Sequence, residues 1–102
     1  MRAAVLLTFA ALAGCAAYEK QQSTRFEPVG NSEFRFEAEA GVDRAEGSAE
    51  AEAIRRGFIA DYVRDNGVCP RGYEIVERRP VLVRRALLGP VHRIFYRGRC
   101  KS

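Results

Sequence analysis

The folded part of this 102-residue chain opens with an alternation of apolar and charged side chains. Phe34, Phe36 and Ala38 are apolar, whereas the residues between them are charged. A period of two residues is typical of a half-buried β-strand. We therefore predict a strand here, which ends at Gly41 and turns one face toward a core.

A helical period follows Gly41. Asp43, with Glu46 three positions later, resembles a helix capping box, and Ser48 is a second candidate cap. Apolar residues then recur every three or four positions up to a stop signal at Asn66 and Gly67, which predicts an amphipathic helix. The expected core-facing stripe consists of Ala51, Ile54, Phe58 and Tyr62, with Ile59 and Val63 at its margin.

Two more apolar runs follow, at residues 73–84 and 91–100. The short turn at 88–90 predicts that they pair as an antiparallel hairpin. Pro80 lacks an amide hydrogen, so the first of these strands is expected at a sheet edge. The last strand then lies in the centre. We predict an α+β fold of the order β-α-β-β, in which one helix packs on one face of a three-stranded antiparallel sheet.

The first residues of the chain follow another pattern. Arg2 is the only charged residue before Glu19. The apolar stretch between them, about residues 3–13, is too short to span a bilayer as a helix, which takes about 20 residues. A basic start, a short apolar core and small residues at its end are typical of a secretory signal.

The residues that end this stretch are Leu12, Ala13, Gly14 and Cys15. They resemble the lipobox of bacterial lipoproteins. The resemblance implies cleavage before Cys15 and attachment of a diacylglyceryl group to its thiol, so that acyl chains anchor the protein in the membrane. Because Ala16 is not aspartate, the resemblance also implies sorting to the outer membrane of a Gram-negative host. The alternative is an ordinary secretory signal cut near residues 11–13, which leaves Cys15 as a free thiol.

These patterns divide the chain into three parts. Residues 1–14 are expected to be a lipoprotein signal peptide. Residues 15–31 show no apolar period and contain Gln, Ser, Pro and Gly, which predicts a lipidated, flexible tether. Residues 32–102 are expected to form a single small α+β domain.

The chain contains three cysteines. Lipidation of Cys15 leaves Cys69 and Cys100, which we expect to form a disulfide in an oxidising compartment. A core of this size is marginal, so a covalent staple is expected. The alternative is a pair of free, buried cysteines. Neither cysteine forms a Cys-x-x-Cys unit, which counts against a zinc or thioredoxin-type site.

Residues suited to catalysis are scarce. His92, the only histidine, shares a strand face with apolar residues, which favours a packed residue over a ligand or a base. The sequence has no Gly-x-Ser-x-Gly turn and no glycine-rich phosphate loop. Asp43, Glu46 and Glu50 could share a helix face, but the helix dipole alone favours acids in a first turn. We expect no enzyme activity, no cofactor and no metal.

Charge is distributed unevenly along the chain. Residues 71–102 carry a net charge of +7, and residues 15–70 a net charge of −4. Guanidinium groups bind carboxylates and phosphates through paired donors, so the basic hairpin predicts a docking face for an anionic partner. The alternative is a solvated face whose arginines discourage edge-to-edge pairing. The expected docking residues are Arg93, Arg97 and Arg99 on the last strand, extended by Arg78 or Arg84 on its neighbour.

These features favour a small cell-envelope lipoprotein that binds or scaffolds other envelope components without catalysis. Its expected partners are the membrane, through Cys15, and an acidic envelope protein or an anionic glycan or lipid. Nucleic acid is a poor candidate, because only Phe95 and Tyr96 interleave the arginines as stacking platforms. The alternative is an inhibitor of an envelope hydrolase or, less favoured, a small hydrolase.

Overall fold

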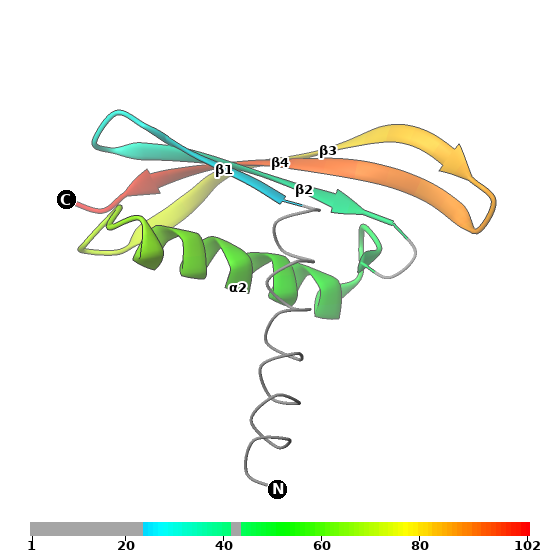
Figure 1. The fold of residues 1–102 in the computed structure, drawn as a ribbon, viewed down its shortest axis with the longest axis horizontal. Helices are drawn as coiled ribbons and strands as arrows, with labels where there is room; N and C mark the ends of the chain where they lie inside the picture. The colour runs from blue at the N-terminus through cyan, green and yellow to red at the C-terminus, as the bar shows by residue number, and fades with distance from the viewer. Residues whose placement is uncertain (1–23, 42–43) are drawn as a thin grey trace, which may run out of the picture.

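A computed structural model of the chain describes residues 24–41 and 44–102 (Figure 1). This part of the chain has an α+β fold, in which a single antiparallel sheet is covered on one face by a helix. The elements are β1 (Thr24–Val29), β2 (Glu33–Ala40), α2 (Ala49–Asp65), β3 (Tyr73–Ala86) and β4 (Gly89–Cys100). Their order across the sheet is β1-β2-β4-β3.

The sheet has four strands, so the prediction of three is wrong. The additional strand, β1, consists of residues assigned above to the flexible tether at 15–31. Too few of its residues are apolar to produce a period, and pairing with β2 holds it in place, with Phe26 opposite Phe36. The predicted arrangement of the other strands is confirmed, because β4 lies between β2 and β3 and Pro80 lies on an edge strand. The predicted signal peptide and Cys15 lie outside the described residues.

Helix α2 begins after Ser48, the second of the two candidate caps. The Ser48 Oγ accepts a hydrogen bond of 3.2 Å from the backbone N–H of Ala51, which satisfies one of the free donors of the first turn. Asp43 lies outside the described residues. The buried helix residues are Ala51, Arg55, Ile59 and Val63, so the core-facing stripe is rotated relative to the predicted one.

The core lies between α2 and the sheet. Phe34 and Phe36 of β2 and Ile94 and Tyr96 of β4 are almost completely buried in it. Phe34 lies opposite Gly98, where a Cβ atom would overlap the phenylalanine ring. Glycine is therefore required at position 98 because an aromatic ring from the next strand occupies the side-chain space.

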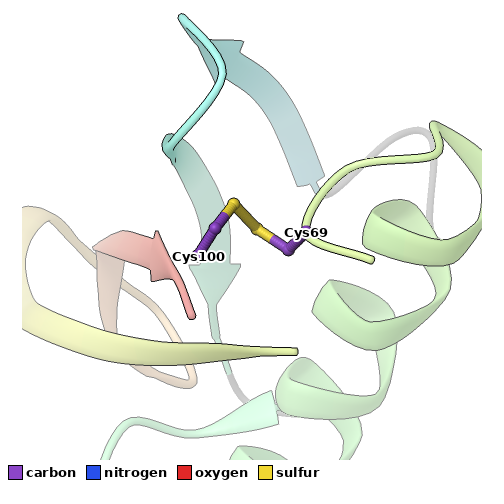
Figure 2. The surroundings of a disulfide bond; sticks show 2 residues. All are labelled: Cys69 and Cys100. Atoms are coloured by element: carbon purple, nitrogen blue, oxygen red, sulfur yellow. A yellow bond between two sulfur atoms is a disulfide. The ribbon is translucent and has the colours of Figure 1, made fainter. Parts of the chain in front are cut away.

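A disulfide joins Cys69 and Cys100, which confirms the predicted pairing (Figure 2). It connects the loop after α2 to the end of β4 and brings together two Cα atoms that lie 31 positions apart in sequence and 4.8 Å apart in space. The hairpin explains the proximity, because Tyr73 at the start of β3 pairs with Cys100.

Strands β3 and β4 continue past the end of β2. The last pair between β2 and β4 is Ala40 with His92, whereas β3 and β4 stay paired as far as Ala86 and Gly89. The end of this hairpin therefore projects beyond the rest of the sheet as a two-stranded ribbon (Figure 1).

Candidate functional site

The face of the sheet opposite α2, which we call the outer face, is not covered by any described element (Figure 1). Strand alternation places arginines and glutamates on it in similar numbers. The arginines are Arg25, Arg35, Arg79, Arg84, Arg93, Arg97 and Arg99, and the glutamates are Glu27, Glu33, Glu37, Glu39, Glu74 and Glu77. Phe95 is an aromatic residue among them. The outer face is thus a mosaic of opposite charges rather than a uniformly basic surface.

Arg93, Arg97 and Arg99 lie together on the outer face, at the positions that strand alternation predicts for them. Each of them pairs with a glutamate of a neighbouring strand. The pairs are Arg93–Glu37 at 3.0 Å, Arg97–Glu33 at 3.4 Å and Arg99–Glu74 at 2.8 Å. Much of the charge on these three arginines is therefore balanced within the protein.

Arg78 does not extend this row, because it lies on the opposite face of the sheet. A bulge between Ile75 and Glu77 inserts one residue into β3, so that Arg78 lies opposite Tyr96 and points toward α2. A shift of one residue moves every later side chain of a strand to the other face. Arg84 follows a second bulge and pairs with Glu39 at 3.3 Å, with both side chains exposed.

The centre of the outer face contains a shallow hollow of about 510 Å³ around Phe95. Arg35, Arg79 and Arg97 line this hollow together with Glu37 and Glu77. The Arg79 guanidinium lies 5.0 Å from the centre of the Phe95 ring, in a cation–π arrangement.

Arg35 and Arg97 are direct cross-strand neighbours in the register of β2 and β4. Like charges at directly opposite positions destabilise a sheet. Arg97 is partly compensated by Glu33 and, at 3.7 Å, by Glu77. Neither Arg35 nor Arg79 forms an ion pair within residues 24–41 and 44–102. Glu27 of β1 lies opposite Arg35 in the register without forming an ion pair with it, so both guanidinium groups beside the hollow keep donors for an anionic group from outside.

Arg35 and Arg79 are not among the docking residues predicted from the sequence. Arg35 lies on a strand that is acidic as a whole, and Arg79 lies next to the misassigned Arg78. A signal for both was present in the alternation along β2 and in the arginine pair before Pro80, but only the strand register shows that they meet at Phe95.

A second cluster of charges lies on the helix side of the sheet and consists of Glu52, Arg55, Arg78 and Tyr96, which we call the buried ion cluster. Arg55 is only 1% exposed. Its side chain donates hydrogen bonds to the Tyr96 Oη at 3.2 Å and to the Arg44 carbonyl oxygen at 2.7 Å. Glu52 accepts hydrogen bonds from the Tyr96 Oη at 2.9 Å and from the Arg78 Nη2 at 3.0 Å.

The pKa of Glu52 reflects this environment. Partial burial by itself would raise it, but hydrogen bonds from Arg78, Tyr96 and Arg55 and the charge of Arg78 lower the pKa to about 2. Burial and the neighbouring carboxylate raise the pKa of Tyr96. The charges and hydrogen-bonding groups of this cluster are paired with one another, so we interpret the cluster as a structural connection between α2 and the sheet.

His92 lies on the helix side of the sheet, opposite Ala40 and Leu82. No group of three or more His, Cys, Asp or Glu side chains in the described part of the chain is arranged to hold a metal ion. Among these same residues, no helix has the length and apolar character needed to cross a bilayer. Comparison with protein-family models, with curated proteins and with solved structures finds no match.

Proposed function

We propose that this chain is a small, non-enzymatic lipoprotein of the cell envelope whose domain docks an anionic partner through the outer face of its sheet. The observation that supports this most strongly is the hollow around Phe95. There Arg35 lies opposite Arg97, and Arg79 stacks over the ring without a carboxylate partner among the described residues.

The chemistry of the hollow favours a carboxylate that belongs to a protein. Arginine forks bind carboxylates with two parallel hydrogen bonds, and the half-buried Phe95 ring, flanked by guanidinium groups, favours an extended side chain over a compact ion. The glutamates around the hollow would repel a uniformly anionic glycan or lipid surface. A protein with a mixed surface can instead place one acidic residue between Arg35 and Arg79 and match the surrounding charges.

The proposed site can be tested by photocrosslinking in intact envelopes. A photoreactive phenylalanine analogue at position 95 of the full-length chain should give a discrete protein adduct. Changing Arg35 and Arg79 to Gln should reduce the yield of the adduct several-fold, because the hollow then lacks the two guanidinium groups that form no ion pair among the described residues. The control variant, R71Q/K101Q, loses the same charge in exposed segments outside the outer face and should crosslink normally. Equal yields from both variants would favour the solvated-face interpretation.

The lipid anchor is a separate proposal, which the lipobox-like residues 12–15 support. Replacing Cys15 with Ser should abolish incorporation of labelled acyl chains and leave an unprocessed precursor. Normal cleavage with release of a soluble protein would instead indicate an ordinary secretory signal.

A further inference from the structure

The end of the β3–β4 hairpin carries the large exposed apolar side chains of the described protein. Leu82 is 45% exposed, Val83 53%, Leu87 102% and Leu88 78%. Together with Arg84 and Arg85 these residues form what we call the hairpin tip. Exposed apolar groups gathered in one place are typical of a site that contacts a protein or a membrane.

The shape of the hairpin tip is convex. Ala86 pairs with Gly89, so the turn consists only of Leu87 and Leu88. It lies beyond the last residue of β2, on a ribbon that neither α2 nor another described element covers (Figure 1). A rigid protein would need a preformed pocket to enclose such a projection, whereas the fluid interface of a bilayer closes around it.

The charge of the hairpin tip points to an anionic surface. The chain has no Asp or Glu after Glu77. The only ion pair of Arg84 within the described residues is an exposed one, with Glu39 at 3.3 Å, and Arg85 has none there. Arg84 and Arg85 lie three and two positions before the turn, separated from it by Ala86, where lipid phosphates would lie if the leucines entered the acyl boundary.

We propose that the hairpin tip inserts into the headgroup region of an anionic lipid bilayer, with Leu87 and Leu88 in the acyl boundary and Arg84 and Arg85 against the phosphates. Elements that bind at the membrane surface combine a small buried apolar area with attraction between basic residues and anionic lipids. This surface is distinct from the outer-face hollow, so the two proposals stand or fall separately.

The course of β1 agrees with this orientation. Thr24 pairs with Ala38, close to the end of β2 from which the hairpin projects, so the chain enters the sheet from the side of the hairpin tip. Cys15 precedes Thr24 by nine positions in the sequence, a length of chain that spans at most about 30 Å. An acyl anchor at Cys15 and the hairpin tip could therefore contact the same bilayer.

The chain has no natural tryptophan, so a single introduced one reports on its own surroundings. The test uses the full chain with Leu88→Trp and vesicles of phosphatidylethanolamine and phosphatidylglycerol. The emission should shift to shorter wavelength and be strongly quenched by brominated acyl chains. The matched control is Asn31→Trp, in the exposed turn of the β1–β2 hairpin at the other end of the sheet, where emission should stay as in water.

The emission and quenching of the introduced tryptophan report only on the surroundings of position 88, so they do not depend on whether other segments also bind the vesicles. In the Leu88→Trp background, R84Q/R85Q should reduce the quenched fraction several-fold, whereas R71Q/K101Q, with the same change in charge, should not. Water-like emission from Leu88→Trp on vesicle-bound protein would overturn the proposal. Equal quenching in phosphatidylcholine vesicles would refute the role of anionic lipid. Quenching confined to vesicles that contain envelope proteins would identify a protein as the occupant instead.

Discussion

Helix α2 is connected to the sheet by different chemistry at its two ends. Near its first turns the connection is polar, through Glu52 and Arg55 to Tyr96 and Arg78. Beyond its last turn the connection is covalent, through the Cys69–Cys100 disulfide (Figure 2). The two ends should therefore respond to different conditions, the first to pH and the second to reduction.

The aromatic rings at the second end strengthen this contrast. Tyr62 stacks on Phe26 with ring centres 5.2 Å apart, and Phe34 meets Tyr73 edge to face at 5.3 Å. Ring packing and a disulfide hold this end without an ion pair between the described residues of α2 and the sheet. The ion pairs and hydrogen bonds of the polar end stabilise the fold less than their number suggests, because desolvation of the charges opposes their attraction.

The largest expected effect is at the disulfide end. Reduction of Cys69–Cys100 should lower the free energy of unfolding by about 3–4 kcal/mol, because the bond closes a loop of roughly 30 residues in the unfolded chain. Denaturant unfolding with and without a reductant measures this. The C69S/C100S variant should match the reduced protein and be insensitive to the reductant. A stability that does not change on complete reduction would show that the rings alone hold this end.

The polar end should be nearly as costly to break. Glu52→Gln should destabilise the protein by about 3 kcal/mol, because the buried Arg55 then lacks its carboxylate partner. Glu50→Gln is the matched control, since Glu50 lies in the same first turn but is exposed. Its effect should stay below about 0.5 kcal/mol. Equal effects of the two changes would mean that only the helix dipole is involved.

Acidification should weaken the polar end alone. The folded pKa of Glu52 is about 2, lower than its ordinary value of 4.5. The carboxylate therefore stabilises the fold above pH 4.5, and this contribution is lost as the pH falls from 4.5 to 2. We expect a loss of about 2 kcal/mol, since solvent screens a side chain that remains 22% exposed. Unfolding curves at pH 6 and pH 2.5 measure it.

Two variants distinguish the contribution of Glu52 to the pH dependence of stability from that of the other acidic residues. Glu52→Gln should remove this part of the pH dependence. Glu74→Gln should leave most of it, although the Arg99 hydrogen bond also lowers the pKa of Glu74, because both side chains of that pair are exposed and solvent screens their attraction. A pH profile that Glu52→Gln leaves unchanged would contradict the assignment.

The two ends also differ in how far the sequence predicts them. Cysteine parity and the hairpin together predict the Cys69–Cys100 bond. The polar end is missed for two physical reasons. Arginine is rarely buried, so Arg55 is not recognised as part of the stripe, although it lies four residues from both Ala51 and Ile59. The bulge at Val76 also moves Arg78 from the outer face to the helix side of the sheet, and no residue in that segment predicts a bulge.

The same limits apply to the rest of the fold and to the outer face. The regular periods of β2, α2 and β4 predict those elements well, because burial on one face requires them. Strand β1 has no such period and depends on pairing with β2. The outer-face hollow depends on cross-strand register, which places Arg35 opposite Arg97 and Arg79 opposite Phe95. Register is a tertiary property, so no single segment of the sequence contains it.

The smallest expected effect on stability is at the disulfide end, where a substitution can remove the hydroxyl of Tyr62 and keep its ring. The Tyr62 Oη and the Thr24 Oγ1 share a hydrogen bond of 2.8 Å, which ties the start of β1 to α2. Tyr62→Phe keeps the ring stacked on Phe26 and removes only the hydroxyl, so we expect a loss of about 1 kcal/mol. Thr24→Val should cost a similar amount. If the hydrogen bond is the shared cause, the double variant should cost less than the sum of the two, with a coupling energy of at least about 0.5 kcal/mol. Strictly additive effects would mean that β1 is held by its rings and its pairing with β2, and that the hydroxyl contact contributes nothing.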